Sequence, residues 1–103
     1  MKVLKDGHGY ELANFEADCP ETNQHLHFIE KLPALGGALV TVQDGTTNEE
    51  VLAMLIDRMQ FLQRAFPCRE NAIVITKLEE SLMWLNKRTA DRKARNVEGR
   101  HEK

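Results

Sequence analysis

The chain has 103 residues, of which 42% are hydrophobic and 29% are charged. This length suggests one domain, and this composition is typical of a folded chain rather than a disordered one. The net charge of -2 argues against a general binder of polyanions, which would be basic throughout.

The first 45 residues have the pattern of a small antiparallel sheet. Asp6-Gly7 predicts a turn, and the alternation in QHLHFIEKL predicts one strand bracketed by Pro20 and Pro33. A flexible turn at PALGG then leads to a last strand, ALVTV, over residues 38–42.

Residues 46–95 have the pattern of a helical hairpin. Thr47 and Glu50 stand at the spacing of a capping box, Pro67 ends the first helix, and a second helix begins near Arg69 or Glu70. Because the break between the helices is short, we expect them to be antiparallel. The predicted core positions form two stripes on the first helix (Val51, Leu55, Arg58, Leu62 and Phe66; Leu52, Ile56 and Met59) and one on the second (Ile75, Leu78, Leu82 and Leu85).

The predicted fold class is therefore α+β, with a small N-terminal antiparallel β-sheet followed by a two-helix antiparallel hairpin. One domain would span residues 1–95, with a sheet part over 1–45 and a helical part over 46–95, and residues 96–103 would be a polar tail. Both helices also carry apolar residues away from the core stripes, and the pattern leaves open whether the sheet or another subunit covers them. These are Met54, Phe61, Ile73, Met83 and Trp84.

Positive charge is concentrated at the end of the second helix. Between Lys87 and Lys103, seven basic side chains face three acidic ones, a local charge of +4 that leaves -6 for the rest of the chain. Arg88 and Arg92 are four residues apart, so they are neighbours on one helix face and could clamp a phosphate. The alternative is a solvated helix end that the helix dipole favours.

Several other functions are disfavoured by the sequence. DNA binding is not expected, because the acidic remainder would be repelled and the basic residues lie at the wrong end of a recognition helix. His25 and His27 share a strand face, but no spacing identifies the further ligands that a metal site needs. No catalytic residue, metal or cofactor is predicted, and we expect a protein that is not an enzyme.

The predicted location is the cytoplasm. The segment MKVLKDGHGYEL has no apolar region of the secretory kind, and no apolar run is long enough to cross a membrane. Cys19 and Cys68 are accordingly expected to be free thiols.

Three segments of the chain resemble a known family. GYELANF, DGTTNEEVLAMLIDRMQFLQ and PCRENAIVITKLEESLMWLNKRTADR are similar to the phage Thoeris anti-defence proteins of the first type. Those proteins are sponges for glycocyclic ADP-ribose, and they share their helical hairpin with the phage anti-CBASS sponges, which bind cyclic dinucleotides. The resemblance covers about residues 9–95 and is strongest from Gly45 to Arg92. It implies a homo-oligomer, at least a dimer and by family a hexamer, acting in the host cytoplasm during infection.

The resemblance also implies four ligand contacts. Phe61 would stack on the adenine, Asn71 would make a polar contact, and Arg88 and Arg92 would contact the pyrophosphate and sugar. Asn71 and Arg88 are 17 residues apart on one helix, which is about 25 Å. The arginines would therefore belong to a second subunit if all four residues line one pocket. A sponge for cyclic di- or trinucleotides and a non-catalytic helical interaction module are the alternatives.

Overall fold

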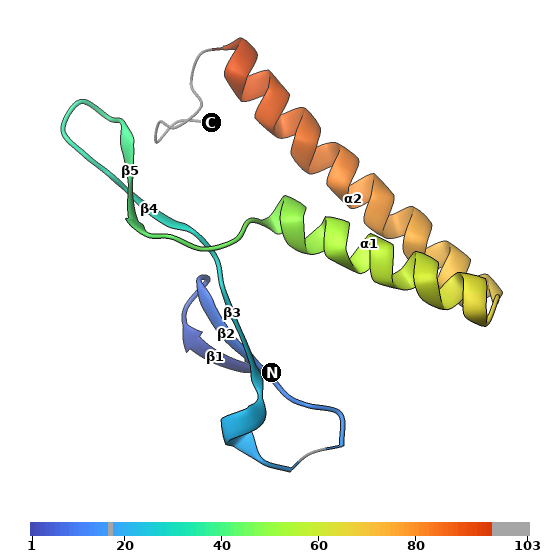
Figure 1. Cartoon of the computed structure of the whole chain (residues 1–103). Helices are drawn as coiled ribbons and strands as arrows, with labels where there is room; N and C mark the ends of the chain where they lie inside the picture. The colour runs from blue at the N-terminus through green and yellow to red at the C-terminus, as the bar shows by residue number, and fades with distance from the viewer. Residues whose placement is uncertain (17, 96–103) are drawn as a thin grey trace. The chain divides into compact units, whose positions relative to one another are not determined.

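The computed structural model describes residues 1–16 and 18–95. They form an α+β structure, as predicted, in which short antiparallel strands precede two helices (Figure 1). The chain divides into two compact units, Met1–Thr47 and Asn48–Lys103. The predicted polar tail, residues 96–103, lies outside the described residues.

The first unit contains two small sheets. The strands are β1 (Lys2–Lys5), β2 (Gly9–Leu12), β3 (Gln24–His27), β4 (Glu30–Pro33) and β5 (Leu39–Gln43). The first three form one antiparallel sheet in the order β1-β2-β3, and β4 pairs with β5 in a second antiparallel sheet. The predicted turn at Asp6-Gly7 is present, and Gly7 has the positive φ of 73° that a glycine adopts at little cost.

The prediction of one strand through QHLHFIEKL is wrong, because the structure breaks it at Phe28 and Ile29 and shares it between two sheets. At the break the backbone leaves its sheet partner and pairs with the segment before the first helix. Ile29 N–H donates to the Thr46 carbonyl at 2.9 Å, and Thr46 N–H donates to the His27 carbonyl at 2.9 Å. Side-chain alternation continues through the break, so the sequence pattern contains no sign of it.

Gly45 permits this close backbone crossing. A Cβ atom at residue 45 would lie 2.6 Å from the His27 carbonyl oxygen and 2.7 Å from the Phe28 carbonyl carbon. Both are backbone atoms, so neither can rotate away as a side chain would. Nearby, the Phe28 ring meets Tyr10 edge to face with 5.9 Å between ring centroids, a preferred aromatic geometry.

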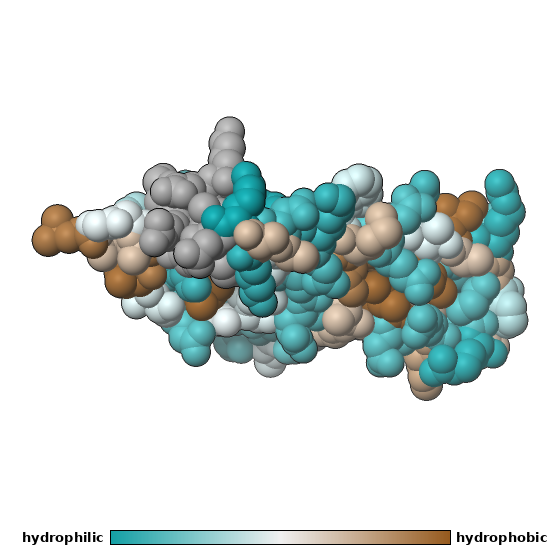
Figure 2. All heavy atoms as spheres, turned by 90° about the horizontal axis from the view of Figure 1, so that it is seen from above, coloured by the Kyte–Doolittle hydropathy of each residue, from teal (hydrophilic) through white to brown (hydrophobic). Residues whose placement is uncertain are grey.

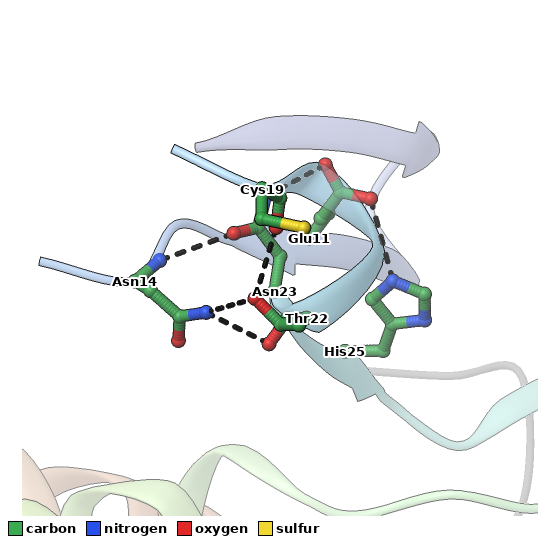
Figure 3. Close-up of polar contacts among 6 residues, drawn as sticks. All are labelled: Glu11, Asn14, Cys19, Thr22, Asn23 and His25. Atoms are coloured by element: carbon green, nitrogen blue, oxygen red, sulfur yellow. Dashed lines mark hydrogen bonds and ion pairs between the residues drawn. The ribbon is translucent and has the colours of Figure 1, made fainter. Parts of the chain in front are cut away.

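A polar cluster secures the connection between β2 and β3, which includes the 3-10 helix η1 (Pro20–Thr22) (Figure 3). Glu11 on β2 accepts a hydrogen bond from Asn23 Nδ2 at 3.2 Å and lies 3.3 Å from His25 Nε2. Asn14 Nδ2 donates to both the carbonyl and the hydroxyl of Thr22. The hydrogen bond from Asn23, more than the proximity of His25, holds the pKa of Glu11 below its ordinary value of 4.5.

The second unit is the helical hairpin, with α1 (Asn48–Ala65) and α2 (Arg69–Ala94) packed against each other. The half-buried positions of α2 alternate four and three apart, as in a coiled coil. They are Asn71, Ile75, Leu78, Leu82, Leu85, Thr89 and Arg92. This confirms the predicted core stripe of α2 and extends it by one residue at the N-terminal side and two at the C-terminal side.

On α1, only one of the two predicted stripes becomes the seam. Leu52, Ile56 and Met59 are half-buried. The other stripe is confirmed only in part. Val51 and Leu62 are half-buried, whereas Arg58 is exposed, Leu55 is 37% exposed and Phe66 is 78% exposed. Two helices that pack along a narrow seam cover about one stripe each, so the second apolar stripe of α1 is left partly in water. Figure 2 shows apolar residues, in brown, between polar ones on the surface of the hairpin.

The loop between the helices is held by groups that the sequence analysis did not identify. Gln63 Nε2 donates to the Cys68 carbonyl at 3.1 Å, and Cys68 N–H donates to Gln63 Oε1 at 3.0 Å. Cys68 Sγ accepts from Asn71 N–H at 3.4 Å, so a thiol occupies the N-cap of α2. Cysteine is not among the preferred N-cap residues, which is why the pattern did not indicate this contact.

Replacement of Gly45 by alanine should destabilise the first unit by about 1–3 kcal/mol, because the added methyl group overlaps backbone atoms of the β3–β4 junction. Thermal unfolding followed by circular dichroism measures the loss. Gly9→Ala is the matched control. The atom nearest to the added Cβ would be His27 Nδ1 at 3.3 Å, and this side chain can shift. A loss for Gly45→Ala no larger than that for Gly9→Ala would contradict the proposed role of the crossing.

The Glu11 cluster predicts a loss of stability in acid. Because the pKa of Glu11 is lowered on folding, its carboxylate stabilises the fold above the unfolded pKa, and this contribution disappears as the pH falls below about 4.5. Melting temperatures of wild type and Glu11→Gln should differ at neutral pH and converge in acid. Glu79→Gln, on an exposed part of α2, is the control and should follow wild type at every pH. A difference in melting temperature between wild type and Glu11→Gln that stays constant down to pH 3 would refute this prediction.

Candidate functional site

The structure places two of the four predicted ligand contacts near the loop end of the hairpin. Phe61 lies in the last turns of α1 with 60% of its surface exposed, and Asn71 is the third residue of α2 and half-buried. Their side chains do not share a face. Asn71 belongs to the seam, whereas Phe61 lies about 160° around α1 from the seam residue Met59, at 100° per residue. The exposed ring of Phe61 is therefore presented to solvent and not to α2.

Arg88 and Arg92 lie at the other end of the hairpin. Because α2 is an unbroken helix from Arg69 to Ala94, Asn71 and Arg88 are separated by about 25 Å along its axis. α2 has 26 residues and α1 has 18, so the last eight residues of α2 extend about 12 Å past the start of α1. Both arginines lie on this extension. One hairpin thus separates Phe61 and Asn71 from the two arginines.

The two arginines have different surroundings. Arg92 is half-buried and continues the seam stripe of α2, whereas Arg88 is exposed. Within the described part of the chain, Arg88 has no hydrogen bond or ion pair to another protein group. Its guanidinium is consequently available to an anion without first breaking a protein contact, and guanidinium groups bind phosphate oxygens in bidentate geometry.

A shallow depression of about 200 Å³ surrounds Arg88. It is lined by Trp84, Lys87, Arg88, Asp91 and Arg95. Lys87 Nζ lies 2.8 Å from Asp91 Oδ2, and Arg95 Nε donates to the Asp91 backbone carbonyl at 3.4 Å. Three cations and one carboxylate leave a charge of +2 around an exposed aromatic ring. Such a set can bind a phosphate-bearing aromatic ligand.

The remaining candidate residues are structural. His25 pairs with Glu11, and Cys19 and Cys68 are free thiols. In residues 1–16 and 18–95 there is no group of three or more His, Cys, Asp or Glu side chains that could hold a metal ion. No helix of this part of the chain is long and apolar enough to cross a membrane.

Comparison with known proteins places the hairpin in a family. Residues 28–90 match the family model described as the Acb2/Tad1 hairpin domain. The matched range includes Phe61, Asn71 and Arg88 and ends two residues before Arg92. The chain is also 62% identical over 61 residues to Thoeris anti-defense 1 of Bacillus phage SBSphiJ7. The aligned residues make up 58% of this chain and 43% of that protein. The alignment thus spans less than half the length of this relative. Because the family model matches more than half of the chain, the protein belongs to the Acb2/Tad1 hairpin-domain family.

Proposed function

We propose that this protein is a phage anti-defence sponge, which binds a cyclic ADP-ribose isomer, glycocyclic ADP-ribose, and sequesters it without degrading it. Blocking of Thoeris immune signalling in the host cytoplasm would follow from removal of the signal. The proposal is supported by the similarity to Thoeris anti-defense 1 and by the separation of an exposed aromatic ring from an unengaged guanidinium along one hairpin.

The chemistry of the four residues suits tight binding without turnover. Stacking of an adenine on Phe61 would contribute about 1–3 kcal/mol. Charge-assisted hydrogen bonds from Arg88 and Arg92 to phosphate oxygens would contribute about 1.5–3 kcal/mol each. The backbone N–H of Asn71 is engaged by Cys68, which holds this residue in the first turn of α2. Its side-chain amide could both donate hydrogen bonds to a ligand and accept them from it.

Two subunits would complete each pocket. A nucleotide of this class is about half as long as the 25 Å between Asn71 and Arg88, so one hairpin cannot hold one ligand with both ends. A two-fold dimer of hairpins would join the Phe61 end of one subunit to the Arg88 end of the other and would form two identical pockets. Large exposed side chains on both helices, among them Met54 at 57% and Met83 at 54%, supply apolar surface for such an interface. A hexamer would be three such dimers.

A sponge for cyclic di- or trinucleotides is the second candidate. It is favoured by the family model, whose hairpin domain carries two protein names rather than one. A thermal-shift panel of ADP-ribose isomers against cyclic di- and trinucleotides separates the two functions. A protein that responds to neither group of ligands would instead be a helical interaction module.

Replacement of either arginine should weaken ligand binding. Arg88→Ala and Arg92→Ala are each expected to lower the affinity for glycocyclic ADP-ribose by about 10- to 100-fold, because each removes a charge-assisted phosphate contact. Isothermal titration calorimetry measures the change. Lys93→Ala is the matched control, since it removes one positive charge from the same turn but lies about 100° around α2 from Arg92.

Equal affinity in both arginine variants and wild type would exclude this pocket. Ligand released from the saturated wild-type protein by heating should be recovered at its original mass. Recovery of a modified nucleotide would instead show that the protein is an enzyme.

Mixed assemblies should test whether the pocket is shared. The variants Phe61→Ala and Arg88→Ala are co-expressed with different tags and purified through both, so that mixed dimers are selected. About half of the sites in these dimers should regain wild-type affinity, because one of the two pockets of each mixed dimer combines two intact halves. Calorimetric stoichiometry reads this fraction, and each variant alone is the control. If every pocket used residues of a single subunit, no mixture would regain a wild-type site.

A further inference from the structure

Trp84 is exposed and lies outside the seam between the two helices. It lies about 160° around α2 from the seam residue Leu82, at 100° per residue, so α1 packs on the opposite side of the helix. The indole is 61% exposed. An aromatic side chain of this size in water is a common feature of surfaces that bind another molecule.

The surroundings of Trp84 indicate the chemistry of that molecule. Arg88 is one turn further along α2, and both residues line the same depression. The four-residue spacing corresponds to about 6 Å along the helix axis, which is comparable with the distance between the base and the phosphate of one nucleotide. The carboxylate of Asp91 is already paired with Lys87, so it opposes an incoming anion less than a free carboxylate would.

We infer that Trp84 is a further ligand-binding residue, which stacks on the nucleobase of the ligand whose phosphates Arg88 binds. In the shared pocket proposed above, on which this inference rests, Trp84 would contact one face of the base and Phe61 of the partner subunit the other. An aromatic ring on each face of a base selects a planar ligand and excludes inorganic phosphate and simple sugar phosphates. The charge of +2 around the indole matches the two negative charges of a pyrophosphate.

Tryptophan fluorescence provides a direct test, because Trp84 is the only tryptophan in the chain. Titration of the full-length protein with glycocyclic ADP-ribose should quench the emission, with a midpoint equal to the calorimetric dissociation constant. Trp84→Ala should weaken binding by about 5- to 100-fold, whereas Trp84→Phe, which keeps an aromatic face, should stay within about threefold of wild type. Inorganic pyrophosphate, which has no base, should leave the emission unchanged.

Glu79→Ala is the control, because it shortens an exposed side chain of α2 about 140° around the helix from Trp84; it should bind as wild type does. Circular dichroism and light scattering of Trp84→Ala should show a folded protein with the wild-type subunit number. If wild type binds the nucleotide but its emission does not change and Trp84→Ala binds equally well, the inference is wrong and the proposed function stands. Loss of the assembly in Trp84→Ala would make Trp84 an interface residue and would also overturn the inference. Failure of wild type to bind any nucleotide overturns both proposals.

Discussion

The packing of α1 against the part of α2 nearest the loop is the constraint on which the rest of the hairpin depends. Its seam uses half-buried residues four and three apart, and this alternation keeps one narrow stripe of each helix facing the other. A narrow seam has two consequences. It leaves Phe61 and Trp84 outside the packed surface. It also lets α2 continue past the start of α1, so that Arg88 is exposed on this helical extension.

Under the proposed function, the same packing would make one hairpin an incomplete binding site. A helix is stiff over its whole length because every turn is hydrogen-bonded to the next. The distance between Asn71 and Arg88 cannot shorten unless α2 breaks, and the described helix contains neither proline nor glycine at which a break would be favoured. The stiffness of α2 thus keeps Asn71 apart from Arg88. In the proposed function, association of two subunits would bring the two ends of the hairpin together around one ligand.

The first unit depends on a different kind of interaction, namely backbone hydrogen bonds at a crossing. The segment from Gly45 to Thr46 pairs with residues His27 to Ile29, and this pairing divides what would otherwise be one long strand between two sheets. Only a residue without a Cβ atom fits at position 45. In the described residues no large side chain of this unit is fully buried. Polar contacts around Glu11, rather than a large buried core, therefore stabilise the connection between β2 and β3.

The sequence by itself determined the α+β class, the helix boundaries near Thr47, Pro67 and Arg69, and the core stripe of α2. These features follow from local rules, because capping residues, proline and 3.6-residue periodicity act within a few positions of the chain. It also determined the long separation of Asn71 from Arg88, since the rise of a helix is fixed. Only the tertiary structure decided which stripe of α1 forms the seam, where QHLHFIEKL breaks, and that Cys68 caps α2. Each of these depends on which distant group lies opposite, and neither periodicity nor residue preference contains that information.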